Sequence, residues 1–186
     1  HTIIQNVTSN DLVCRANDGY FTDPNNNRVY YVDAALNTRV VDSGIEFPNG
    51  LALSPDQTLL YVADMRGQFA YSFQIQPDGS LAYKQPFFHL HAGFGQKQTS
   101  ADGMTVDTEG RLYIATDLGV QVCDQPGRVH LIIKKPQDAW LANIVFGGKD
   151  RDILYATCAD KVFKRRLNAQ GLFPAEGPNK PPRPRL

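Results

Sequence analysis

Residues 49–64, NGLALSPDQTLLYVAD, decide the fold of this chain. The stretch opens on Asn49, continues in short apolar alternation, breaks at a polar turn around Pro55 and then enters an apolar run that contains Tyr61. Apolar alternation on both sides of a turn with Pro and Asp is typical of two antiparallel strands. The stretch therefore predicts a β-hairpin with one buried face.

The same pattern occurs three more times. The other copies are NDLVCRANDGYFTDP from Asn10, DGMTVDTEGRLYIAT from Asp102 and NIVFGGKDRDILYAT from Asn143. Each copy reaches a strand tyrosine after 10 to 12 positions, and the four starts are separated by 39, 53 and 41 residues. Spacings of about 40 to 50 residues are those of four-stranded propeller blades. Further strand-like runs follow each copy and no capped helical pattern occurs, so the sequence predicts an all-β propeller of four-stranded antiparallel blades.

The repeats also set the expected domain limits. We expect blades over residues 1–170 and a proline-rich tail over residues 171–186, which wraps the surface or is mobile. The longest interval between copies contains residues 86–102, which we interpret as a loop over one face.

Composition excludes several classes of function. The 19 basic residues balance 19 acidic ones, so neither nucleic acid nor an anionic membrane is an expected partner. No apolar run is long enough to span a bilayer, which predicts a soluble chain and leaves a cytoplasmic, periplasmic or secreted location open. GxSxG, HExxH and P-loop motifs are absent, and we interpret Cys14, Cys123 and Cys158 as free buried thiols.

Propeller geometry brings equivalent residues of successive blades together. Inner strands surround a central channel, so Asn10, Asn49, Asp102 and Asn143 would ring its mouth. Their amide and carboxylate oxygens are hard donors that suit Ca²⁺, Mg²⁺ or Mn²⁺. The alternative is that these residues only open β-turns, where Asn and Asp are common.

Five segments resemble the SMP-30/gluconolactonase family. They are EFPNGLALSPDQTLLYVAD (46–64), SNDLV (9–13), YFTDP (20–24), ADGMTVDTEGRLYIAT (101–116) and NIVFGG (143–148). The resemblance implies a six-bladed β-propeller of divalent-metal-dependent lactonases and related hydrolases. It also implies that Asn10, Asn49 and Asp102 face the metal.

The chain departs from the family pattern at its start. The remaining metal ligand of the family is a Glu in an early blade that precedes these residues, and only four of six blades are counted. A complete member would carry about a hundred more residues before His1. Four blades of a six-fold ring would leave a gap with two unpaired edges. Three alternatives remain: the chain is truncated, another chain supplies the missing blades, or four blades close into a ring alone. We expect missing blades or a partner that supplies them.

The resulting hypothesis is a metal-dependent hydrolase that opens a lactone ring. Asp102 would be both a metal ligand and the base that takes a proton from the attacking water. Asn10 and Asn49 would hold the cation, with Ca²⁺ favoured and Mg²⁺, Mn²⁺ or Zn²⁺ as alternatives. Asn143 would hold the cation or the lactone. The alternative function is a non-catalytic, calcium-stabilised propeller that acts as a binding scaffold.

Four further residues are secondary candidates. Asp23 and Asp64 follow strands and would position substrate hydroxyls or cap turns. His91, close to His89, would line the mouth and bind substrate, or be an ordinary residue of the rim. We interpret Trp140 as packing in the core rather than as a wall of the pocket.

Overall fold

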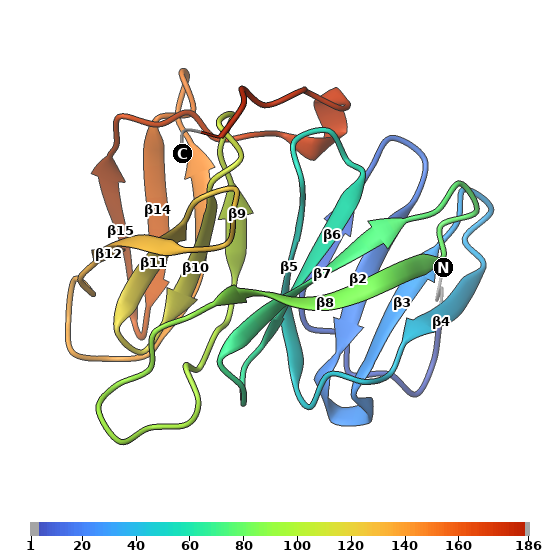
Figure 1. Cartoon of the computed structure of the whole chain (residues 1–186), viewed down its shortest axis with the longest axis horizontal. Coiled ribbons are helices and arrows are strands. Elements are labelled where there is room, and N and C mark those ends of the chain that lie inside the picture. Colours follow the sequence, from blue (N-terminus) through green and yellow to red (C-terminus); the bar gives the residue numbers. More distant parts are fainter. Residues whose placement is uncertain (1–3, 185–186) are drawn as a thin grey trace.

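The computed structural model describes residues 4–184, which form four antiparallel sheets (Figure 1). We call the sheets blades 1 to 4 in chain order. Blade 1 contains β1 (Leu12–Cys14), β2 (Gly19–Asp23), β3 (Arg28–Val32) and β4 (Thr38–Asp42). Blade 2 contains β5 (Pro48–Leu53), β6 (Leu59–Asp64), β7 (Phe69–Ile75) and β8 (Leu81–His89). Blade 3 contains β9 (Met104–Val106), β10 (Leu112–Thr116), β11 (Gly119–Cys123) and β12 (Val129–Ile133). Blade 4 contains β13 (Leu141–Gly147), β14 (Ile153–Cys158) and β15 (Lys161–Arg166).

Each blade is a meander whose first strand is innermost. The strands of every sheet pair in sequence order, and β1, β5, β9 and β13 together line a central cavity of about 230 Å³. The prediction of an all-β propeller is confirmed. Blade 4 differs from the expectation, because three strands rather than four are described in it. After Arg166 the chain leaves the sheet instead of pairing again.

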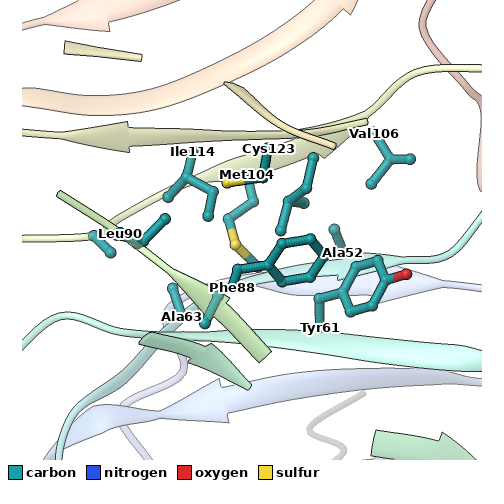
Figure 2. Close-up of a cluster of buried hydrophobic side chains, with 12 residues drawn as sticks. Ala52, Tyr61, Ala63, Phe88, Leu90, Met104, Val106, Ile114 and Cys123 are labelled. Atoms are coloured by element: carbon teal, nitrogen blue, oxygen red, sulfur yellow. The ribbon is translucent and has the colours of Figure 1, made fainter. Parts of the chain in front are cut away.

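The cores lie in the seams, by which we mean the interfaces between consecutive blades. Strand alternation gives each blade two faces, and each seam joins the apolar face of one blade to that of the next. Figure 2 shows the seam between blades 2 and 3, where Phe88 lies edge-on to Tyr61 and Met104 fills the space between the sheets. The other two seams are built alike, around Tyr20 and Phe73 and around Tyr113 and Phe146.

The ring of blades is open. Among the described residues, the buried apolar clusters join blades 1 to 2, 2 to 3 and 3 to 4, and none joins blade 4 to blade 1. The repeat shows what is missing: Tyr20, Tyr61 and Tyr113 are 0 %, 7 % and 4 % exposed in their seams, whereas Tyr155 is only partly buried. Leu12 is 64 % exposed although its equivalent Leu51 is 5 % exposed. Within residues 4–184, no blade packs on the outward face of blade 1 or of blade 4, although Phe21 and Tyr30 on the outward face of blade 1 are buried.

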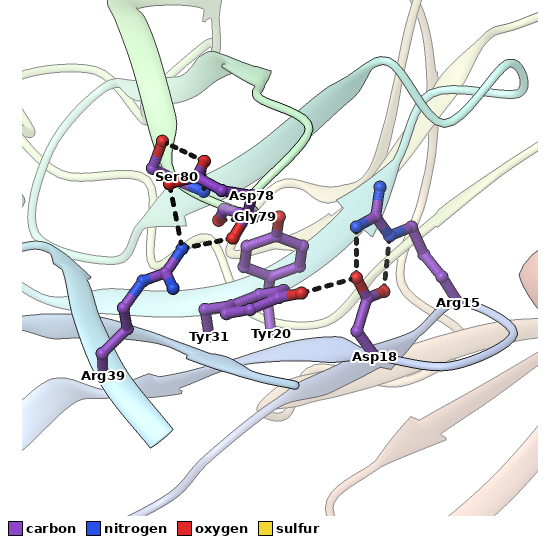
Figure 3. Close-up of polar contacts among 8 residues, drawn as sticks. All are labelled: Arg15, Asp18, Tyr20, Tyr31, Arg39, Asp78, Gly79 and Ser80. Carbon is purple, nitrogen blue, oxygen red and sulfur yellow. Dashed lines mark hydrogen bonds and ion pairs between the residues drawn. The ribbon is translucent and has the colours of Figure 1, made fainter. Parts of the chain in front are cut away.

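Polar contacts close the outer end of the first seam (Figure 3). Tyr20 donates its hydroxyl hydrogen bond to the carbonyl of Gly79 in the β7–β8 turn at 3.1 Å. Gly79 has φ +80°, and a Cβ there would lie 2.2 Å from the ring of Tyr31. On blade 1 itself, Asp18 pairs with Arg15 and accepts from the Tyr31 hydroxyl at 2.9 Å. The turn of blade 2 therefore rests directly on aromatic rings of blade 1.

Residues 167–184 form a strap across the end of the cavity (Figure 1). Leu172 donates its N–H to the carbonyl of Val106 at 3.0 Å, and Gln57 donates to that of Pro174 at 2.6 Å. The short helix η2 (Pro174–Glu176) lies on this strap, and η1 (Pro24–Asn26) follows β2.

Neither of these helices, nor any other in residues 4–184, has the length and apolar character to cross a membrane. All three cysteines are free, with Cys14 exposed and the other two buried, so only the expected burial of Cys14 is wrong.

Candidate functional site

The inner strands bring Asp11, Asn49, Asp102 and Asn143 to one mouth of the channel. Asp11 directly precedes β1, Asn49 is the second residue of β5, Asp102 lies just before β9, and Asn143 lies in β13. Asn143 Nδ2 approaches Asp11 Oδ1 to 3.5 Å, so blades 1 and 4 meet here although no apolar core joins them. The four side chains therefore face a common point, as the repeat predicted for three of them.

Two glycines allow this close approach of neighbouring blades. A Cβ on Gly50 would lie 2.1 Å from the carbonyl oxygen of Asp102, and one on Gly103 would lie 2.0 Å from Oδ1 of Asn143. Any larger residue at either position would require its neighbour to move, which glycine avoids. The glycine that follows Asn49 and the one that follows Asp102 thus belong to the construction of the site.

Thr22 and Thr157 hold the site residues from the second strands. The Thr22 hydroxyl donates to the carbonyl of Asn49 at 2.7 Å and accepts the N–H of Asp11 at 3.2 Å. Thr157 accepts the N–H of Asn143 at 3.0 Å. Sequence reasoning missed both residues, although each stands shortly after the strand tyrosine of its repeat.

The surroundings of Asp102 and Asp11 disfavour the charged form of both carboxyl groups. Burial, and secondarily the nearby charge of Asp11, raises the pKa of Asp102 to about 6, although hydrogen bonds from Trp140, Asn49 and the Gly103 N–H lower it. Burial also raises the pKa of Asp11, against the lowering effect of hydrogen bonds from Leu51 and Asn143. Two partly buried acids near one another, both with raised pKa, form a site that favours positive charge.

Asn49 supplies the observation that a cation would explain. Its Oδ1 is buried without a hydrogen-bond partner, while its Nδ2 contacts the sulfur of Met65 at 3.3 Å. An unpaired buried amide oxygen costs about 1–3 kcal/mol and calls for a specific reason. Within residues 4–184 no group of three His, Cys, Asp or Glu residues gathers, so a metal here would need this amide oxygen beside Asp11 and Asp102. That all-oxygen donor set fits a hard divalent cation.

Three residues predicted for the site lie elsewhere or are already occupied. Asn10 is exposed and lines a hollow of about 970 Å³ on the outward face of blade 1, while its neighbour Asp11 reaches the cluster. Asp23 is fully buried and caps η1 by accepting from the N–H and the amide of Asn26. Asp64 accepts the N–H groups of Phe47 and Arg66. The turn-capping alternative therefore describes the two aspartates.

His91 was expected to line the mouth and Trp140 to pack in the core, but it is Trp140 that lies at the site. The backbone of His91 is clamped by the buried amide of Gln121, at 2.8 and 2.7 Å, and its side chain is exposed. Among residues 4–184, no hydrogen bond joins His91 to Asp102. Trp140 is 42 % exposed and donates its indole N–H to Oδ2 of Asp102 at 3.2 Å. The interpretation of Trp140 as a core residue is wrong, because it lies beside the cluster.

The fold and this cluster can be compared with known proteins. The family described as SMP-30/Gluconolactonase/LRE-like region matches residues 4–160. The chain belongs to this family. A gluconolactonase of Zymomonas mobilis is 25 % identical over 171 residues, which is 82 % of this chain and 48 % of the relative. Rabbit regucalcin is 27 % identical over 143 residues, covering 72 % of this chain and 46 % of the relative.

A solved structure gives the same result. A gluconolactonase of Xanthomonas campestris superposes with a TM-score of 0.73 and 26 % identity over 86 % of this chain and 57 % of that one. The chain thus spans about half the length of these members of the SMP-30/gluconolactonase/LRE-like family.

Proposed function

We propose that this chain carries the site of a divalent-cation-dependent hydrolase that opens a lactone ring. The cluster of Asp102, Asp11 and Asn49 carries the proposal, because it joins two carboxylates to an amide whose Oδ1 is buried without a hydrogen-bond partner. The resemblance to two gluconolactonases supports a lactone as the substrate class. The cation is proposed from the donor atoms, among which Ca²⁺ fits an irregular all-oxygen site best.

Each residue of the cluster has a proposed task. Asn49 Oδ1, Asp11 and one oxygen of Asp102 hold the cation, and Asp11 takes the part expected for Asn10. Asp102 also accepts a proton from the attacking water through the oxygen that does not hold the cation. Asn143, exposed at the rim, orients the lactone through its amide. When bound, the cation would polarise the lactone carbonyl and stabilise negative charge on its oxygen.

The open ring gives this proposal a second part. The outward faces of blades 1 and 4 repeat faces that elsewhere in the chain are buried in seams, and their exposed residues include Leu12, Val40, Val145 and Val162. We propose that further blades of the same kind, from another chain or another part of the protein, cover these faces. Such blades would also complete the wall of the mouth on the side where blades 1 and 4 lack a common apolar core.

The test is lactone hydrolysis followed in a pH-stat with aldonolactones and simple γ- and δ-lactones. Turnover should disappear with EDTA and return with Ca²⁺ or Mn²⁺. Asp102→Asn should lower kcat by at least about a hundredfold, because it removes the proton acceptor and a charged ligand. It should not destabilise the cation-free chain, because the charge of Asp102 is disfavoured there.

Asp138→Asn is the matched control, since the Asp138 side chain is fully exposed and lies outside the cluster. Full activity of Asp102→Asn, or turnover that is insensitive to EDTA, would contradict the proposal. A chain that Ca²⁺ stabilises against heat without any turnover would instead support the scaffold function.

A further inference from the structure

Trp140 is the one tryptophan of the sequence, and it lies against the candidate site. Its indole N–H is 3.2 Å from Oδ2 of Asp102, and 42 % of the residue is exposed. Large aromatic side chains usually occur in seams in this molecule, as Tyr61 and Tyr113 do. An exposed tryptophan that contacts a carboxylate of the site therefore requires a different explanation from packing.

The backbone around Trp140 is fixed on both sides. Its carbonyl accepts the N–H of Ala159 at 2.8 Å, and the amide of Gln137 donates to the carbonyl of Cys158 at 2.8 Å. Leu141, the first residue of β13, is 3 % exposed in the seam with blade 3. The β14–β15 turn and the seam thus hold the backbone of Trp140 in place, so binding of the indole to Asp102 has to order the side chain alone.

The hydrogen bond from Trp140 crosses the seam between blades 3 and 4 and uses one of the two carboxylate oxygens of Asp102. Asp102 belongs to blade 3 and Trp140 enters blade 4, so the contact fixes the carboxylate relative to the neighbouring blade as well as its own. The indole occupies Oδ2 and has no acceptor function of its own. Oδ1 of Asp102 is then free to hold a cation, and the second lone pair of Oδ2 remains available to a water molecule.

We propose that Trp140 is a positioning residue that orients Asp102 for cation binding and proton transfer. The roles in cation binding and proton transfer rest on the proposed function. The contact itself does not depend on that function. It predicts that removal of the indole N–H alone impairs the site, although the aromatic ring stays.

Trp140→Phe tests the inference, because it removes the N–H and keeps a flat apolar ring. Ca²⁺ affinity measured by calorimetry should fall about five- to tenfold, the effect of one hydrogen bond to a charged group at a partly exposed position. In lactone hydrolysis kcat should fall by a similar factor while KM stays within about twofold. Tyr83→Phe is the matched control, since it removes a polar hydrogen from an exposed aromatic residue of β8 and should change neither quantity.

Two spectroscopic readouts need no activity. Because Trp140 is alone, the emission of the protein reports its surroundings, and Asp102→Asn should shift that emission in the cation-free chain. Tb³⁺ bound at the site should luminesce when Trp140 is excited, and this signal should weaken in Asp102→Asn.

The outcomes separate the inference from the proposed function. Unchanged Ca²⁺ affinity and kcat in Trp140→Phe overturn the inference in an active wild type, and unchanged emission in Asp102→Asn overturns it in any case. A wild type that neither binds a cation nor hydrolyses a lactone overturns the proposed function. An emission shift in Asp102→Asn then still supports the contact, because that measurement requires no ligand.

Discussion

Single residues of blade 1 make part of the stability depend on pH. Asp18 pairs with Arg15 and accepts from the hydroxyl of Tyr31, and these bonds, that with Arg15 foremost, hold the pKa of Asp18 below its ordinary 3.8 (Figure 3). Because the folded-state pKa is the lower one, the contacts stabilise the fold above pH 3.8, and this stabilisation is lost as the pH falls through the folded-state pKa.

Asp18→Asn should therefore lower the free energy of unfolding at neutral pH and change it little in acid. Urea unfolding of both proteins between about pH 7 and pH 3 measures the difference. A constant difference over that range would contradict the assignment of this pH dependence to Asp18.

At the same scale, the sequence predicted Asn49, Asp102 and Asn143 but not Asp11. The repeat aligns opening residues along the chain and thereby selected Asn10. It cannot decide which of two adjacent residues points into the mouth, because successive side chains of an extended segment point to opposite sides. The contact of Asp11 Oδ1 with Asn143, a residue of another blade, shows which of the two side chains reaches the mouth, and no local pattern encodes it.

The inner strands lie so close together at Gly50 and Gly103 that the atoms beside each glycine decide which substitutions are tolerated. The space beside Gly50 is filled by the backbone carbonyl of Asp102, whereas the space beside Gly103 is filled by the end of the exposed Asn143 side chain. A backbone cannot move aside without shifting a strand, while a side chain can rotate away.

Gly50→Ala should therefore destabilise the protein by about 1–3 kcal/mol, and Gly103→Ala by clearly less. Gly103→Ala should instead weaken Ca²⁺ binding or lactone turnover, since it displaces Asn143. Urea unfolding and calorimetry separate the two effects, with Gly93→Ala as a control whose Cβ meets only ordinary contacts. Equal destabilisation by both substitutions would show that the strands are not packed as described.

The elements themselves were predictable to a large extent. Four hairpins with a strand tyrosine, and the strands after each, follow from period-two alternation and turn residues. The third strand of blade 4 was predictable from KVFKRRL, and the proline-rich residues after it predicted a tail that wraps the surface. The end of β8 was not predicted: residues 86–102 read as a loop, yet residues 86–89 belong to this strand. Its pairing with β7 depends on a partner strand and not on a local pattern.

The whole molecule exposes two seam faces. On blade 1, Val40 is 42 % exposed, and on blade 4 Val162 is 69 % exposed, both on the outward side. Apolar faces of this kind usually bind another surface. An isolated chain of this length should therefore self-associate as its concentration rises, because one outward face can cover another.

Val162→Glu, and separately Val40→Glu, should reduce this association and change the stability of the monomer by less than about 0.5 kcal/mol. Sedimentation velocity over a range of concentrations measures the association. Gln85→Glu, an exposed residue of β8 outside both faces, is the matched control. A chain that stays monomeric at high concentration would contradict the description of these faces as unpartnered.

The strap has a consequence for how the molecule comes apart. Blades 2 and 3 have a neighbour on each side, while blades 1 and 4 have one seam each, so an open row of blades should fray from its ends. Yet residues 167–184 start at blade 4 and are bonded to blades 3 and 2, which links the most weakly held end to the middle of the row. Loss of the strap would therefore let blade 4 open first, and amide hydrogens of β13 and β14 would exchange with solvent long before those of β6 and β10.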